Sequence, residues 1–216
     1  ATLPGLYRFG RKDRGVHVFR NVRLTRAGPH SVTATDVKKK AVRGTDRLSV
    51  VAGPAATLAA EGPAQANAGQ AIQVTATGED AFGNPLGDVT SNLTLSMVPG
   101  EGSCSGSSCT PTLAGSRSIS ASFGSARDQV PVNVVPGSLA SITAEGPGQV
   151  IADEPIEVTV TGADQFGNPL GEVGAGQVTL SVSPDGACSA SSCTAQASGP
   201  HTVTAGVQTA SDTIDV

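Results

Sequence analysis

One pattern occurs twice in this 216-residue chain, and its landmarks recur at one fixed interval. The landmarks of the two copies are Glu61-Gly62-Pro63 with Glu145-Gly146-Pro147, Asp80 with Asp164, Cys104 with Cys188, and Cys109 with Cys193. The interval is longer by a single residue between LTLSMVP (93–99) and VTLSVSP (178–184). In the turn that follows, the second copy is shorter by one residue, so the common interval is restored. Such compensating length changes are typical of a strand between loops. The repeat predicts two domains, residues 53–136 and 137–216.

Residues 1–52 match only part of this pattern. AGPHSVTA (27–34) is similar to SGPHTVTA (198–205), and the alternating residues before Gly53 match those before Gly137. We therefore expect residues 1–52 to be the C-terminal half of a diverged repeat, and both chain ends to lie within a longer array. Half of a sandwich leaves one sheet face uncovered and one strand edge unpaired. This part should be loosely ordered or should borrow a partner.

Apolar residues alternate with polar ones within each copy, as in Ile72, Val74 and Ala76. A period of two indicates half-buried strands, and similar runs give about seven strands in each copy. Aromatic residues make up 3% of the chain and Trp is absent, so the core must consist of Val, Ile, Leu and Ala. Gly and Pro fall between the runs, as turns require. The sequence predicts an all-β chain of tandem immunoglobulin-like β-sandwich domains without a long helix.

Three motifs carry a resemblance to a known family: the leading AEGP, the bends DAFGNPLGD (80–88) and DQFGNPLGE (164–172), and the closing AG or SG before a Ser/Thr-Ala pair. They resemble bacterial immunoglobulin-like repeats of the filamin and invasin type, which occur in tandem on surface and secreted proteins. The segment from Tyr7 to Phe19 is similar to filamin-type repeats. The Trp and inter-sheet disulfide of antibody domains are absent, so that branch is not implied. The resemblance implies a fold more than a function, because such modules serve many roles.

Each full copy contains two cysteines in a Ser-rich bend, CSGSSC (104–109) and CSASSC (188–193). Recurring pairs predict the local disulfides Cys104–Cys109 and Cys188–Cys193, formed in an oxidising compartment. A loop this short removes little entropy from the unfolded chain, so each bond should add about 2 kcal/mol or less. Free thiols and a metal site are the alternatives. A metal site needs four converging ligands, and the middle copy has no His.

The FGNP bends place Gly and Pro where a sharp turn between strands needs them. We expect Asn84 and Asn168 to occupy a turn position or a left-handed conformation. The flanking carboxylates allow a second interpretation, a calcium site formed by Asp80 with Asp88 and by Asp164 with Glu172. Calcium needs six to eight oxygen ligands, and neither an EF-hand loop nor a dense acidic ladder is present. The sequence favours turn chemistry and leaves the calcium site as the alternative.

Charge is distributed unevenly along the chain. Residues 1–52 contain twelve Lys/Arg and three Asp/Glu, whereas residues 137–216 contain no Lys/Arg and nine Asp/Glu. The basic residues that could form an anion-binding patch are Arg8, Arg20, Arg23, Lys38, Lys39 and Lys40. Such a patch would suit teichoic acid or another anionic surface. The alternative is a diverged repeat with basic outward positions, and we expect the lysines to lie in a turn between the last two strands.

The sequence favours no catalytic function. GSCSG (102–106) superficially resembles a nucleophile elbow, but the middle copy has no His to act as a base. His17, His30 and His201 are too few for a repeated catalytic constellation, and His30 and His201 share one repeat position, which we expect to face solvent or a neighbouring strand. No reading motif or stacking platform accompanies the basic residues, so specific nucleic-acid binding is not expected. We predict no enzyme activity, no cofactor and no membrane span.

These features predict a non-catalytic segment of a secreted or cell-surface bacterial protein that acts as a stalk, spacer or adhesion module. Its partners would be neighbouring repeats of the chain and a surface protein or polysaccharide. The first alternative is a carbohydrate-binding accessory module of a secreted hydrolase, but few rings are available, with Tyr7, Phe82 and Phe166 as the main candidates. The second is a filamin-like crosslinking repeat, which the paired cysteines disfavour.

The cysteine pairing gives the first prediction. Thiol titration of the unfolded but unreduced protein should detect no free thiol, because each cysteine has its partner five positions away in its own copy. Reduction before titration should release four thiols and serves as the control. Four free thiols without reduction would contradict the pairing.

Overall fold

A computed structural model describes all of residues 1–216. It divides into two compact units. The first contains Ala1–Glu61, Val74–Leu95 and Ser120–Val130, and the second contains Gly62–Gln73, Ser96–Ile119 and Pro131–Val216. The boundary between the units falls inside the middle copy of the repeat. The division into domains 1–52, 53–136 and 137–216 therefore stays a prediction, and the elements are described below in chain order.

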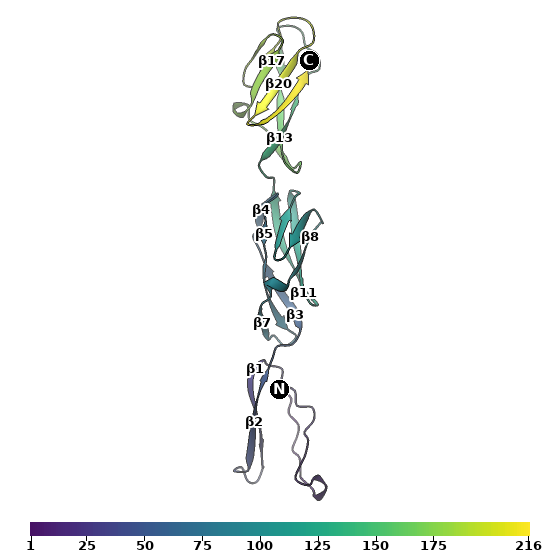
Figure 1. Cartoon of the computed structure of the whole chain (residues 1–216), viewed down its shortest axis with the longest axis vertical. Coiled ribbons are helices and arrows are strands. Elements are labelled where there is room, and N and C mark those ends of the chain that lie inside the picture. Colours follow the sequence, from purple (N-terminus) through teal and green to yellow (C-terminus); the bar gives the residue numbers. More distant parts are fainter. The chain divides into compact units, whose positions relative to one another are not determined.

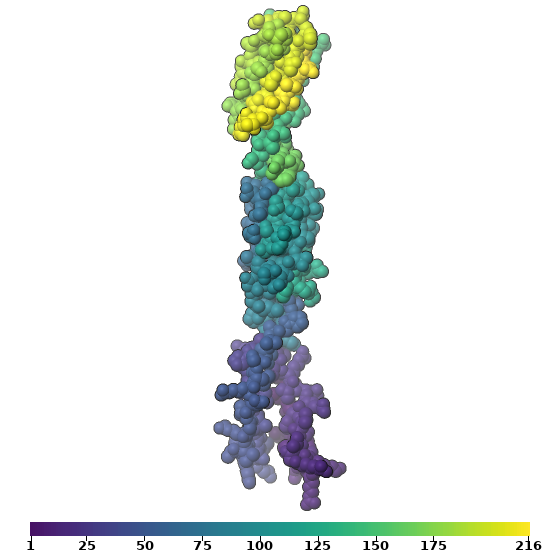
Figure 2. Space-filling model, in the orientation of Figure 1, coloured from purple at the N-terminus to yellow at the C-terminus, as the bar shows by residue number.

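Residues 1–52 contain a hairpin and little other regular structure (Figure 1). Their elements are η1 (Arg11–Asp13, a 3-10 turn), β1 (Gly28–Thr35) and β2 (Arg43–Val50). The two strands pair antiparallel from Gly28 opposite Val50 to Thr35 opposite Arg43. Neither strand contains a fully buried residue. Figure 2 shows the hairpin and the N-terminal segment as two separate columns of atoms along most of their length.

Residues 53–136 contain ten strands and one 3-10 turn. They are β3 (Ala55–Glu61), β4 (Gln65–Asn67), β5 (Ile72–Gln73), β6 (Thr75–Asp80), β7 (Pro85–Asp88), η2 (Thr90–Asn92), β8 (Thr94–Val98), β9 (Gly102–Ser105), β10 (Ser108–Pro111), β11 (Gly115–Phe123) and β12 (Ala126–Val135). Their sheets have the strand orders β3-β6-β7, β5-β10-β9 and β4-β12-β11-β8. The pairing of β4 with β12 is parallel.

Residues 137–216 repeat this order with one strand fewer. Their elements are β13 (Leu139–Glu145), β14 (Pro155–Glu157), β15 (Thr159–Asp164), β16 (Pro169–Glu172), η3 (Ala175–Gln177), β17 (Thr179–Ser183), β18 (Ala187–Cys188), β19 (Ser192–Thr194), β20 (Thr202–Val207) and β21 (Ala210–Asp215). Three sheets form, with strand orders β13-β15-β16, β14-β19-β18 and β17-β20-β21. Strand β13 follows β3 at the interval of the landmarks, whereas η3 follows η2 at an interval longer by a single residue. The extra residue therefore lies just before η3.

The number of strands in the third segment differs from the seven expected. One alternating run supplies two strands, because β14 and β15 are separated only by Val158 and belong to different sheets. Strand β14 pairs with β19, and β15 pairs with β13. A run that changes sheets keeps its period of two, so the sequence pattern shows one strand where the hydrogen bonds define two.

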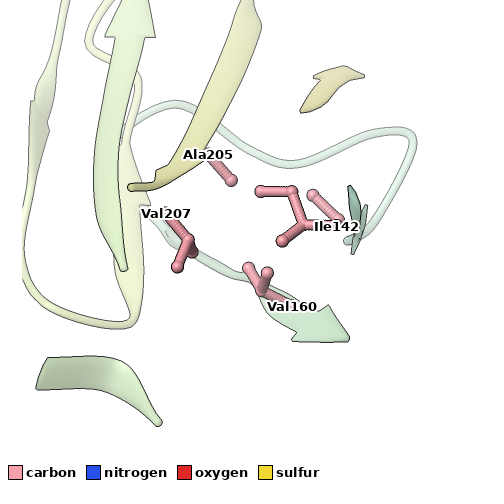
Figure 3. Close-up of a cluster of buried hydrophobic side chains, with 5 residues drawn as sticks. Ile142, Val160, Ala205 and Val207 are labelled. Atoms are coloured by element: carbon pink, nitrogen blue, oxygen red, sulfur yellow. The ribbon is translucent and has the colours of Figure 1, made fainter. Parts of the chain in front are cut away.

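The core of residues 137–216 lies between sheets, as in a sandwich. Strand β20 alternates between half-buried and buried positions, and its buried residues are Val203, Ala205 and Val207. Ala205 and Val207 pack with Ile142 and Val160 of the sheet β13-β15-β16, as Figure 3 shows. Val203 packs in a second cluster with residues of the sheet β14-β19-β18. One face of β17-β20-β21 is therefore covered by the two other three-stranded sheets, and the all-β prediction is confirmed.

No helix in the chain has the length and apolar character needed to cross a membrane.

The core predicts a large difference between two isoleucines five positions apart. Ile156 is 0% exposed and Ile151 is 77% exposed. Replacing Ile156 with Ala should lower the free energy of unfolding by about 2–5 kcal/mol, because the substitution leaves a cavity in the core. The same replacement at Ile151 should change it by less than about 0.5 kcal/mol. Chemical denaturation of both variants tests the packing, and equal effects would contradict it.

Candidate functional site: paired Asp and Asn side chains at the repeat junctions

The FGNP bends follow β6 and β15 and have the same local structure. In the first bend the N–H of Asp80 donates to the carbonyl of Asn84 at 3.0 Å, and the N–H of Gly83 donates to the carbonyl of Asp80 at 3.0 Å. Gly83 has φ +74° and Gly167 has φ +81°. Of the two positions expected for them, Asn84 and Asn168 therefore both take the turn position, and glycine takes the left-handed one. Glycine takes it because it has no Cβ to clash there, and this leaves the Asn side chain free to turn inward.

Asp80 is buried, and both of its carboxylate oxygens accept two hydrogen bonds. Oδ1 accepts from the N–H groups of Phe82 (2.8 Å) and Asn84 (3.0 Å), whereas Oδ2 accepts from the N–H of Gly53 (2.8 Å) and from Nδ2 of Asn84 (2.8 Å). Asp164 has the same four kinds of donor, from Phe166, Asn168, Gly137 and the Asn168 amide, at 2.7–2.9 Å. Each carboxylate is therefore saturated by its own bend and by the glycine that precedes the repeat.

These donors lower the pKa of both carboxyl groups. For Asp80 the hydrogen bond from the Asn84 side chain is the largest cause, followed by that from the N–H of Gly53. For Asp164 burial is the largest effect and raises the pKa, but the donors from Asn168, Gly137 and Phe166 together outweigh burial. N–H donors stabilise the charged form, so both groups remain carboxylates at neutral pH.

The Asn side chains reach the preceding repeat. Nδ2 of Asn84 donates to the carbonyl of Thr25 at 2.7 Å, and Oδ1 accepts from the N–H of Ala27 at 2.7 Å. Asn168 repeats this arrangement with the carbonyl of Thr112 at 2.8 Å and the N–H of Ala114 at 2.7 Å. We call Asp80 with Asn84, and Asp164 with Asn168, the Asp–Asn clamp. The backbone that each clamp binds, residues 25–28 or 112–115, is called the acceptor segment.

The amide orientation in each clamp follows from its partners. A carboxylate oxygen and a backbone carbonyl can only accept, so both must face Nδ2, and a backbone N–H can only donate, so it must face Oδ1. The Asn amide therefore presents one donor and one acceptor to the acceptor segment, as a neighbouring strand would. Asp80 and Asp164 fix the side chain in that orientation through the second Nδ2 hydrogen.

The Phe of each bend also contacts the preceding repeat, but the two contacts differ. The guanidinium carbon of Arg23 lies 5.0 Å from the centre of the Phe82 ring, which is a cation–π geometry. The Phe166 ring lies against Gly69, where a Cβ atom would come within 2.8 Å of the ring. Gly69 also has φ +82°. Phe82 remains 52% exposed, so the rings add to the junctions without being enclosed by them.

The structure does not bring the carboxylates proposed for calcium together. Asp88 lies opposite Thr77 in the β6-β7 pair, three positions along the strand from Asp80, and its Oδ1 accepts from the N–H of Thr90. Glu172 lies opposite Thr161, three positions from Asp164. No group of three or more His, Cys, Asp or Glu residues is arranged to hold a metal ion. The oxygens of Asp80 and Asp164 serve the clamp, and the calcium interpretation has no geometric support.

The basic residues are placed at separate parts of the segment 1–52. Lys38, Lys39 and Lys40 lie in the turn between β1 and β2, as expected, where Asp36 Oδ1 accepts from the N–H groups of Lys38 and Lys39. Arg23 forms a bridge with Thr2 and contacts Phe82. The eight residues of β1 separate the lysine turn from this end by about 25 Å. Arg23 therefore does not share a surface with the lysines, and convergence of the lysines with Arg8 and Arg20 stays a prediction.

The cysteines are paired across two hairpins. Cys104 of β9 lies opposite Cys109 of β10, with Cα atoms 4.0 Å apart and an S–S distance of 2.04 Å. Cys188 and Cys193 are bonded in the same way between β18 and β19. Cys109 and Cys193 are fully buried, so each bond ties its hairpin to the core. The thiol titration above remains the test of this pairing.

His201 is buried, so of the two positions expected for it, facing solvent or facing a neighbouring strand, the first is wrong. It is 5% exposed, its Nδ1 lies 3.0 Å from the carbonyl of Gly199, and its Nε2 lies 3.2 Å from Oδ1 of Asp185. The hydrogen bond to Gly199 is the largest cause that raises its pKa, burial opposes it, and Asp185 raises it further. Oδ1 of Asp185 also accepts from the N–H groups of Gln196 and Ala197.

Comparisons with known proteins add little to this geometry. No protein-family model matches the chain, and a search of curated proteins finds no match. The solved structures that are similar include surface layer protein SbsC domains 4–9, with 22% identity, 88% of this chain and 35% of that chain covered, and a TM-score of 0.29. SbsC domains 4 and 5 are 21% identical, with 76% of this chain and 98% of that chain covered and a TM-score of 0.32. Titin domains Z1Z2 in complex with telethonin are 12% identical, with 78% of this chain and 95% of that chain covered and a TM-score of 0.26. The chain thus spans about a third of the first of these structures, and at such scores no function follows.

The clamp predicts that an isosteric change in Asn84 is costly. In Asn84→Asp the side chain keeps its shape but loses both N–H donors, so the carbonyl of Thr25 loses its partner and a second carboxylate faces Asp80. The free energy of unfolding should fall by about 1–3 kcal/mol. Asn92→Asp adds the same charge at an exposed position of the same repeat and should change it by less than about 0.5 kcal/mol. Thermal unfolding of both variants distinguishes the clamp from a general charge effect.

The lowered pKa values predict acid resistance of both junctions. A carboxyl group with a lowered folded-state pKa stabilises the fold above its unfolded pKa, and the contribution is lost as the pH falls through the folded pKa. The carboxyl ¹³C shifts of Asp80 and Asp164 should therefore stay constant from pH 7 to about pH 4 and change only at more acidic pH. Titration of either carboxyl near its ordinary pKa of 3.8 would contradict the hydrogen-bond geometry.

Proposed function

We propose that this chain is a non-catalytic spacer segment of a secreted or cell-surface protein, in which the clamp holds successive immunoglobulin-like repeats at fixed orientations. The observation that carries the proposal is the recurrence of the clamp. Asn84 and Asn168 each make the same two hydrogen bonds to the preceding acceptor segment. A flexible linker needs no such contacts, because its ends are free to rotate.

The linkers support a fixed orientation as well. Gly53 and Gly137 lie between consecutive repeats, and each donates its N–H to the clamp carboxylate, at 2.8 Å and 2.7 Å. At Gly137 a Cβ atom would lie 3.2 Å from the carbonyl oxygen of Ala68 and 3.3 Å from Oδ2 of Asp164. Gly53 and Gly137 are therefore part of the junctions, and few rotatable bonds remain between one sheet and the next.

The disulfides support the proposed location. Two short cross-strand disulfides persist in oxidising compartments, whereas the cytosol keeps such thiols reduced. A core of Val, Ile, Leu and Ala without Trp contains few large side chains, so a covalent tie in each repeat adds useful stability. We therefore propose that the segment lies outside the cell.

The structure gives less support to the carbohydrate-binding alternative. Two of its three candidate rings, Phe82 and Phe166, contact the preceding repeat at the junctions. The third, Tyr7, stacks on His17 with ring centres 3.3 Å apart, which occupies one of its faces. A sugar needs an open aromatic face, so a spacer is the better account. No specific contact in the structure supports the adhesive role or the filamin-like role.

Residual dipolar couplings test the fixed orientation. In the unaltered chain, couplings from residues 53–136 and 137–216 should fit a single alignment tensor, because the clamp prevents independent reorientation. Asn168→Asp should require two tensors, whereas Gln177→Glu, which adds the same charge at an exposed position, should still require one. Two different tensors in the unaltered chain would contradict the proposed spacer.

A further inference from the structure

The acceptor segment occurs a third time, in residues 196–199. Gln196 and Ser198 follow Thr112 and Ala114 at the interval of the repeat, and each of the three segments ends in a glycine. Gly28, Gly115 and Gly199 have φ values of +116°, +113° and +134°. All three segments therefore end in a glycine with a positive φ. The carbonyl of Gln196 and the N–H of Ser198 occupy the positions that the first two clamps bind, and they make no hydrogen bond within this chain.

The third segment is held in shape without an occupant. Oδ1 of Asp185 accepts from the N–H groups of Gln196 (2.9 Å) and Ala197 (3.0 Å), and His201 bonds the carbonyl of Gly199. The residues at the position of His201 also bond carbonyls of the occupied segments, although not the glycine carbonyl. Arg117 donates to the carbonyls of Leu113 and Ala114, and His30 Nε2 lies 2.7 Å from the carbonyl of Arg26. Preorganised groups bind with a smaller entropy cost.

We propose that residues 196–199 bind the D-x-F-G-N-P bend of a further repeat joined through a short linker after Val216, with its Asn amide bridging the carbonyl of Gln196 and the N–H of Ser198. This inference rests on the clamp of the proposed function. Both occupied segments take their bend from the repeat that follows in the same chain, where the linker keeps the effective concentration high. A second copy of this chain is a poorer source, because its two bends already bind its own acceptor segments.

Asp153 restricts the space for an aromatic ring at this third site. Asp153 follows Gly69 at the interval of the repeat, and each donates its N–H to an equivalent carbonyl, that of Ala195 or of Pro111, at 2.8 Å. Gly69 leaves room for the Phe166 ring, but the Cβ of Asp153 occupies that space. The Phe of an incoming bend must therefore lie elsewhere, as Phe82 does at the first junction. Asp153→Gly should make room for the ring and increase binding.

Amide hydrogen exchange in an extended chain tests the inference. The chain is continued after Val216 by a second copy of residues 133–216, because Val216 follows Val132 by the repeat interval. Exchange at Ser198 should slow by about tenfold or more relative to the unextended chain, as one added hydrogen bond predicts. Asp153→Gly in the extended chain should slow it further. Protected amides of the added core strands verify that the second copy is folded.

Matched variants separate the outcomes. Replacing Asn168 with Ala in the second copy alone should return Ser198 to fast exchange, whereas Gln177→Ala in that copy should not. Unchanged exchange at Ser198, with Ala27 and Ala114 protected, would overturn this inference and leave the proposed function intact. Fast exchange at Ala27 and Ala114 would overturn both. Concentration-dependent protection of Ser198 in the unextended chain would identify a second copy as the occupant and would also overturn the inference.

Discussion

At each junction one Asn amide joins groups that are far apart in the sequence. Asn168 donates to the carbonyl of Thr112 and to Asp164, and it accepts from the N–H of Ala114. Half-buried backbone groups beside a strand need partners, and here a side chain supplies them in place of a further strand. The carboxylate of Asp164 orients this amide, and it also accepts from the N–H of Gly137, which precedes β13. The bend, the linker and the preceding sheet end therefore depend on one another.

The repeat and its alternation predicted most of the fold, because both follow directly from the period of two in strands. The alternating residues Ile72, Val74 and Ala76 are all buried, as expected. The strand count was low because one run serves two sheets and because a short strand, β7 or β16, follows each FGNP bend. Hydrogen-bond partners are not encoded in an alternating pattern. The turn between β1 and β2 was predicted because this copy is longer than the others by three residues at the lysines. A local difference in length of this kind can be seen in the sequence alone.

The clamp was missed although its residues were singled out. Asp80 and Asn84 were interpreted as turn and calcium residues, because a single bend shows neither burial nor the segment that the bend meets. The acceptor segment binds through backbone groups, so Thr25 and Ala27 leave no chemical signature in the sequence. The available signal was the recurrence of AG, at Ala27-Gly28 and Ala114-Gly115, in the repeat before each FGNP bend. The burial of His201 beside Asp185 was likewise not predicted, because that carboxylate lies sixteen positions away in the sequence.

The central claim is that the Asn side chains bridge the junctions through hydrogen bonds, and these bonds can be detected directly. Scalar couplings across a hydrogen bond should appear between Nδ2 of Asn168 and the carbonyl carbon of Thr112, where the two atoms of the bond are 2.8 Å apart. Couplings within the β20-β21 pair provide the internal reference in the same spectrum. We expect both sets to be observed. Reference couplings without any coupling from Asn168 to Thr112 would contradict the account.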